Sequence, residues 1–169
     1  YRPLGKNKVN QLGKRIHNES GAKFFVHAAK ALHTHDQYEK HLAYVYGVLC
    51  HFALDEICHG YVEQAVKETG LAHIAVEGEL DRKLMIMNGE NPVSRRLTGH
   101  IVPSMKNAII IKDFYRGITA KEVKKALNGM VFYDRILVCP SKIKRMALYA
   151  ALKVAGLYYD FHGLSLIHI

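Results

Sequence analysis

Six His, Asp and Glu residues follow one another mostly at a spacing of four, and this spacing constrains the fold more than any other feature of the chain. They form the ladder H-x3-D-x3-H-x13-H-x3-E-x3-D, which comprises His51, Asp55, His59, His73, Glu77 and Asp81. Four residues is about one turn of an α-helix, so each triplet lies on one helical face. We expect two helical faces joined by a hairpin, with a break at Gly60, a short helix over 61–68 and a turn at Thr69-Gly70.

The residue types of the ladder suit a metal ion, although a single His/carboxylate pair at this spacing is common on solvated helices. The segment 42–61, LAYVYGVLCHFALDEICHGY, is apolar nearly all round, which predicts a buried helix. His51, Asp55 and His59 would then point inward, where an unpaired carboxylate is costly. A cation would offset that cost. Imidazole and carboxylate together favour zinc over calcium, which prefers an all-oxygen site.

Apolar residues recur at intervals of three and four along nearly the whole chain. Strand-like alternation is lacking outside MVFYDRILV, which we also interpret as helix. The pattern predicts an all-α fold in one compact domain over residues 1–163. Start signals at Asp36, Thr119 with Glu122, and Ser141 support three helices. The expected helices are Lys8–Asn18, Ala22–His33, Gln37–His59, Tyr61–Glu68, Ala72–Met87, Pro103–Tyr115, Thr119–Val138 and Ser141–Tyr158.

The two ends of the chain carry separate expectations. The chain begins at Tyr1 rather than Met, and we expect that an N-terminal part is missing. Residues 164–169, LSLIHI, have no amphipathic pattern, and we interpret them as a non-native tail. The location therefore stays open between cytoplasm and secretion. No stretch reaches the roughly 18 uncharged apolar residues of a membrane span.

The charge balance favours an anionic partner. The chain has 24 Lys and Arg against 15 Asp and Glu, a formal charge of +9. Such an excess is typical of solvated helix faces, or of proteins that meet anionic lipid or nucleic acid. No glycine-rich phosphate loop or nucleic-acid-binding motif accompanies it. Cys50, Cys58 and Cys139 are an odd number at wide or helical spacing, which argues against disulfides. We expect Cys50 and Cys58 to be buried small hydrophobic residues.

The string HFALDEICHGY, followed by His73, Glu77 and Asp81 and preceded by GKRIH, resembles the bacterial zinc-dependent phospholipase C family. The resemblance runs from about Leu12 to Leu84. It implies an all-helical domain with up to three zinc ions. Elements that supply further ligands near the start of family members have no counterpart here.

The resemblance also implies a role for each ligand. The implied ligands of a paired zinc centre are His17 in GKRIH, His51 and Asp55, the last bridging both ions. The implied ligands of a separate zinc ion are His59, His73 and Glu77.

Resemblance and residue chemistry together imply a zinc-dependent phosphodiester hydrolase that cleaves phospholipid headgroup esters with water activated by zinc. Asp55 is the expected catalytic residue. The expected partner is a phospholipid or another phosphodiester, with a membrane surface as a further partner, and nucleic acid is less favoured. Two alternatives stay open: a single-strand zinc nuclease of similar fold, which the charge of +9 would suit, and a non-catalytic helical zinc-binding protein.

Other polar residues near the ladder receive a plainer interpretation. We expect the upstream histidines to lie on the surface, namely His27, His33, His35 and His41. Asp81 extends the second triplet by one turn. It either accepts a hydrogen bond that orients His73 or is a surface charge, and both readings stay open.

Overall fold

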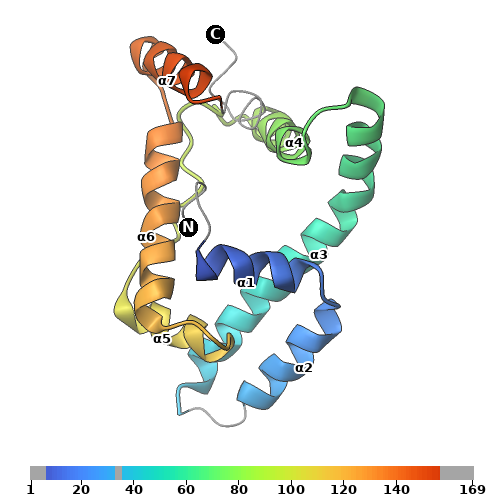
Figure 1. Cartoon of the computed structure of the whole chain (residues 1–169), viewed down its shortest axis with the longest axis vertical. Coiled ribbons are helices and arrows are strands. Elements are labelled where there is room, and N and C mark those ends of the chain that lie inside the picture. Colours follow the sequence, from blue (N-terminus) through green and yellow to red (C-terminus); the bar gives the residue numbers. More distant parts are fainter. Residues whose placement is uncertain (1–6, 33–35, 157–169) are drawn as a thin grey trace. The chain divides into compact units, whose positions relative to one another are not determined.

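The protein is all-α in the part of the chain described by the computed structural model, residues 7–32 and 36–156. Within these ranges the chain forms seven helices and no strand, which confirms the predicted fold class. Figure 1 shows how these helices follow one another. The helices are α1 (Lys8–His17), α2 (Gly21–Leu32), α3 (Tyr38–Thr69), α4 (His73–Met87), α5 (Met105–Asp113), α6 (Ala120–Leu137) and α7 (Lys142–Val154). His33, His35, the helix end expected at Tyr158 and the tail expected over 164–169 lie outside the described residues.

Helix α3 is continuous, so the break predicted at Gly60 is wrong. A glycine inside a helix costs only about 1 kcal/mol relative to alanine, which good helix formers on both sides can outweigh. The helix ends at Thr69, and the following residue, Gly70, has a φ of 67°, which lies in the left-handed region. The Gly70 amide donates to the carbonyl of Val66 at 2.9 Å, and the Thr69 hydroxyl donates to that of Ala65 at 2.6 Å. The turn predicted at Thr69-Gly70 is therefore confirmed.

The capping box predicted from Thr119 and Glu122 is confirmed at the start of α6. The Glu122 amide donates to the Thr119 hydroxyl oxygen at 3.2 Å, and Glu122 Oε2 accepts from the Thr119 amide at 2.8 Å. Segment 130–138 is helical to Leu137, as interpreted from the sequence. Ser141 precedes α7 as expected, although its side chain makes no capping hydrogen bond.

The chain divides into two compact units. Unit 1 comprises Tyr1–Asp55 and Gly99–Phe132, and unit 2 comprises Glu56–Thr98 and Tyr133–Ile169. In unit 1, α2 runs beside the first half of α3 (Figure 1). The core of this unit is formed by Ala28, Leu32, Ile110 and Phe114.

In unit 2, buried polar contacts hold the segment before residue 99 against the end of α6. Asp134 Oδ2 accepts from the Thr98 hydroxyl at 2.7 Å, and the Cys139 amide donates to the Val93 carbonyl at 3.0 Å. The Cys139 side chain is 1% exposed, and its thiol donates to the Ile136 carbonyl. Arg145 Nη1 donates to the Cys139 carbonyl at 2.9 Å. All three cysteines are free, but only Cys139 is buried, so the burial expected of Cys50 is wrong.

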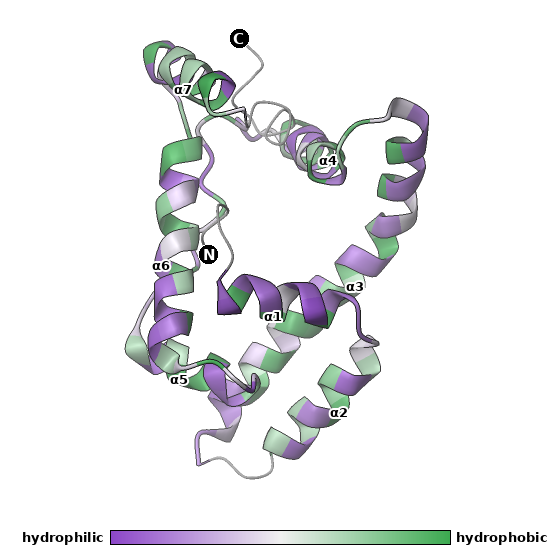
Figure 2. Ribbon diagram, in the orientation of Figure 1, coloured by the Kyte–Doolittle hydropathy of each residue, from purple (hydrophilic) through white to green (hydrophobic). Residues whose placement is uncertain are grey.

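The middle of α3 is exposed, so the burial predicted for segment 42–61 is wrong. Leu54 is 62% and Ile57 is 79% exposed. Figure 2 shows apolar and polar residues mixed along this helix. An apolar helix is buried only where neighbours surround it. Leu42, Tyr44 and Val45 in the first turns of α3 pack against the core of unit 1, and the ring of Phe52 contacts that of Phe25 on α2 at 5.7 Å between centroids. Most of the other side chains of segment 42–61 are exposed or only half-buried. In the described part of the chain, no helix is long and apolar enough to cross a membrane.

Candidate metal centre

The turn between α3 and α4 brings together two of the predicted ligands. The imidazole rings of His59 on α3 and His73 on α4 have centroids 5.4 Å apart. His73 Nε2 lies 3.1 Å from Glu77 Oε1, one turn further along α4. His59 Nε2 lies 3.2 Å from Glu63 Oε1, one turn further along α3. Two His/carboxylate pairs thus face each other, and all four residues belong to unit 2.

These separations can be compared with those around a tetrahedral zinc ion. With metal–donor distances of about 2.0–2.1 Å, two donor atoms lie about 3.3 Å apart and the centroids of two ligating imidazoles about 5 Å apart. The His73–Glu77 separation of 3.1 Å and the His59–His73 ring separation of 5.4 Å are close to these values. The donor types therefore suit zinc, and these two separations are compatible with it.

The convergence is nevertheless incomplete. Among the described residues, no three His, Cys, Asp or Glu side chains come together so as to hold a metal ion. The side chains of His73 and Glu77 are each 44% exposed. The prediction that His59 points into the interior is wrong, because its side chain is 47% exposed even though its ring lies beside that of His73. Water can solvate these groups, so burial does not by itself require a cation here.

Asp81 lies one turn beyond Glu77 on α4. Desolvation raises the pKa of the Asp81 carboxyl, and the negative charge of Glu77 raises it further. The two carboxylates are therefore close enough to repel each other. Asp81 makes no hydrogen bond to His73 within the described residues, so its contribution in this structure is negative charge beside the pair.

The other predicted ligands lie in unit 1, and the structure does not bring them together. His17 is the last residue of α1 and is exposed. His51 is exposed and Asp55 half-buried, four residues apart on α3, and neither points inward as predicted. Within the described residues, none of the three makes a hydrogen bond or an ion pair with another.

Sequence reasoning missed two residues. Glu63 follows His59 at the spacing by which Glu77 follows His73, and that repeat was the available signal. His41 is 4% exposed, so its assignment to the surface is wrong. Its Nε2 lies 3.1 Å from Asp113 Oδ2. No local pattern could have indicated this contact, because the two residues are 72 positions apart.

Comparison with known families adds one finding. The family described as zinc dependent phospholipase C matches residues 2–129, well over half of the chain. The matched range includes all six predicted ligands, from His17 to Glu77. No curated protein and no solved structure matches the chain.

Proposed function

The chain belongs to the zinc-dependent phospholipase C family, and from that membership we propose that it hydrolyses the headgroup phosphodiester of phospholipids. The observation that carries the proposal is the meeting of His59 and His73 at 5.4 Å across the α3–α4 turn. Two helices place imidazoles beside each other there, with a carboxylate one turn along from each. Because the family is zinc-dependent, we interpret this arrangement as part of a zinc site.

The proposed ligands fall into two sets, each within one unit of the chain. In unit 2, His59, His73 and Glu77 would hold one zinc ion. In unit 1, His17, His51 and Asp55 would contribute to a paired centre, which brings the proposed number of zinc ions to as many as three. Asp55 is the residue proposed to bridge that pair, because a carboxylate offers two oxygens to two cations.

Zinc would supply Lewis acidity, lowering the pKa of water from about 15.7 toward 7 and polarising the phosphoryl group. The protein would supply orientation and charge. Glu63 and Asp81 add negative charge around His59 and His73, which favours retention of a dication. The net charge of +9 for the whole chain favours approach of an anionic phospholipid surface.

The test is the zinc-loaded natural protein with Asp55→Asn. The amide cannot offset two dications, so hydrolysis of short-chain phosphatidylcholine and phosphorylcholine esters should be lost while the far-ultraviolet circular dichroism stays helical. Glu56→Gln, the neighbouring exposed carboxylate on α3, is the matched control and should keep activity. Full activity of Asp55→Asn would refute the assignment of Asp55 to the paired centre.

Single-stranded DNA and RNA are assayed beside the phospholipids at equal zinc and pH. If the protein cleaves nucleic acid and leaves phospholipid intact, the phospholipase proposal is wrong and the protein is a nuclease. A protein that binds zinc and cleaves neither substrate would be a helical zinc-binding protein without catalysis.

A further inference from the structure

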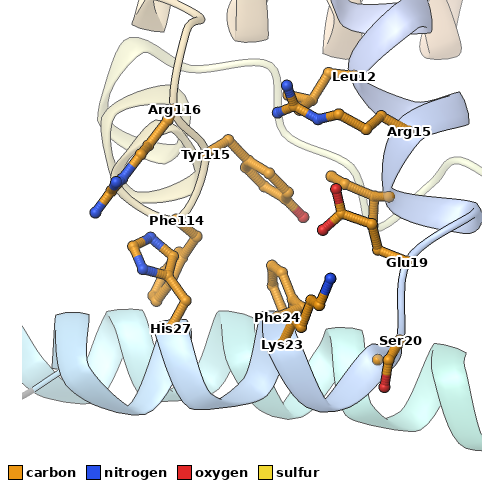
Figure 3. A pocket seen from close by; sticks show the side chains of 12 residues that line it. Leu12, Arg15, Glu19, Ser20, Lys23, Phe24, His27, Phe114, Tyr115 and Arg116 are labelled. Carbon is orange, nitrogen blue, oxygen red and sulfur yellow. The ribbon is translucent and has the colours of Figure 1, made fainter.

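Unit 1 contains a pocket of about 380 Å³ that has no part in the candidate metal centre. It lies between the second half of α1, the start of α2 and the residues that follow α5 (Figure 3). This volume is within the range of small-molecule sites, about 300–1,000 Å³. None of the six proposed zinc ligands lines it.

One wall of the pocket is aromatic and firmly packed. Phe114 is 2% exposed, and its ring stacks on that of Tyr44 with centroids 5.3 Å apart. The hydroxyl oxygens of Tyr44 and Tyr115 lie 2.9 Å apart, and the rings of Phe24 and Tyr115 have centroids 5.7 Å apart. Burial raises the pKa of Tyr115, so its phenol stays neutral. The wall can therefore receive an apolar group without placing a negative charge beside it.

The rim of the pocket is cationic. Arg15 comes from α1, Lys23 from α2 and Arg116 from the segment after α5, so the three cations belong to different elements. In Figure 3, Arg15, Lys23 and the Glu19 carboxylate face the space beside Tyr115, whereas the side chain of Arg116 points away from it. Within the described residues, none of the three cations is held in a salt bridge, and Glu19 is the one carboxylate among the lining residues.

The chemistry of the ligand follows from the two surfaces. Cations on separate elements can each donate to a different oxygen of one anion, and a phosphate group offers several such oxygens. The aromatic wall requires that the same ligand carry an apolar portion. We propose that this pocket binds an organic phosphate whose apolar part packs on Phe24 and Tyr115 and whose phosphate is held by Arg15 and Lys23. The same group could come from a lipid headgroup in a membrane or from a free soluble compound.

The first experiment is calorimetric titration of the whole protein with dihexanoyl phosphatidic acid below its micellar concentration, with inorganic phosphate in parallel. A chelator is present throughout, which removes binding of phosphate to zinc. The amphiphile should bind more tightly than inorganic phosphate, because only the amphiphile can use the aromatic wall. Its affinity should fall as salt is raised.

Charge-removing variants locate the binding. Arg15→Gln and Lys23→Gln should each weaken binding of the amphiphile about tenfold, as loss of a charge-assisted hydrogen bond would. Lys30→Gln is the matched control, since Lys30 is an exposed lysine on the same helix as Lys23 and does not line the pocket. If Lys30→Gln and Lys23→Gln lose the same affinity for the amphiphile, the attraction comes from overall charge and the proposal is overturned. No measurable binding of the amphiphile would also overturn it.

A second arm distinguishes the two sources of the phosphate. Flotation with vesicles of phosphatidylcholine containing phosphatidic acid should capture the protein through Arg15 and Lys23 if the source is a membrane lipid. If only the soluble amphiphile binds through these residues, the source is a free compound. His73→Ala, which removes a proposed zinc ligand, should leave both measurements unchanged, so failure of the zinc proposal and failure of this one give different results.

Discussion

His41 Nε2 and Asp113 Oδ2 lie 3.1 Å apart and join the first turn of α3 to the last residue of α5. The other ring nitrogen, Nδ1, lies 3.0 Å from the carbonyl oxygen of Gln37. A carbonyl and an ionised carboxylate only accept hydrogen bonds, so both contacts are satisfied when both nitrogens carry hydrogen. The ring of His41 also packs on Phe114 in the core of unit 1, at 5.6 Å between centroids.

Asp113→Ala should therefore destabilise the protein. It leaves the buried His41 without one of its acceptors, which costs about 1–3 kcal/mol. Urea denaturation followed by circular dichroism gives the free energy of unfolding. Glu56→Ala removes an exposed carboxylate from α3 and should change this free energy by less than about 0.5 kcal/mol. Equal values for the two variants would mean that the His41–Asp113 contact contributes nothing.

The Tyr44–Tyr115 pair predicts a loss of stability at alkaline pH. Burial raises the pKa of both phenols, and for Tyr44 it is raised far above the ordinary value of 10.0. Above a pH of about 10 the unfolded chain releases these protons while the folded chain retains them, so the free energy of unfolding falls as pH rises.

Absorbance at 295 nm and urea denaturation between pH 8 and about 11 measure this effect. Tyr44→Phe should reduce the alkaline slope of the free energy of unfolding, whereas Tyr46→Phe, at a position 58% exposed, should not. Identical slopes in the two variants would contradict the assignment.

Two glycines of the same region should respond oppositely to alanine. Gly60 lies inside α3 with open space around the position of an added Cβ, so Gly60→Ala should stabilise the protein by about 0.5–1 kcal/mol. Gly70 has a φ of 67°, so Gly70→Ala should destabilise it by about 1–2 kcal/mol. Thermal denaturation of chelator-treated protein compares them. A loss of stability in Gly60→Ala would mean that α3 is interrupted there after all.

Removal of His73 tests the proposed zinc ligands of unit 2. After dialysis, His73→Ala should contain about one zinc ion fewer per chain than the unaltered protein, by elemental analysis. His100→Ala, at an exposed position outside the ladder, should keep the full content. Because the Glu77 side chain is 44% exposed, the chelator-treated variant should unfold at nearly the temperature of the unaltered protein. If the unaltered protein is folded but contains no zinc after dialysis, the proposed zinc site is wrong.

The helices could be predicted because their signals are local. The capping box at Thr119 and Glu122 satisfies backbone groups within one turn, so the sequence nearby determines it. The break predicted at Gly60 was wrong because glycine, although typical of turns, costs a helix only about 1 kcal/mol of stability relative to alanine. The spacing of the ladder located His59, His73 and Glu77 on adjoining helices, and the contacts among them agree with that part of the prediction.

Burial could not be predicted in the same way. Leu54 and Ile57 are as apolar as any core residue, yet their exposure depends on which elements pack around α3, and the composition of α3 does not contain that information. The same limit applies to His41 and Asp113, because long-range pairing decides their environment. Inward-pointing ligands were inferred from apolar composition, and this step of the sequence argument failed.

The different environments of Cys50 and Cys139 make the two thiols chemically distinguishable. Cys50 is exposed on α3 and can react with a thiol reagent in the folded protein, whereas Cys139 is 1% exposed and donates to a carbonyl. Labelling of Cys139 therefore requires that its part of unit 2 open first. The rate of its modification would report local opening near the end of α6 without an introduced cysteine.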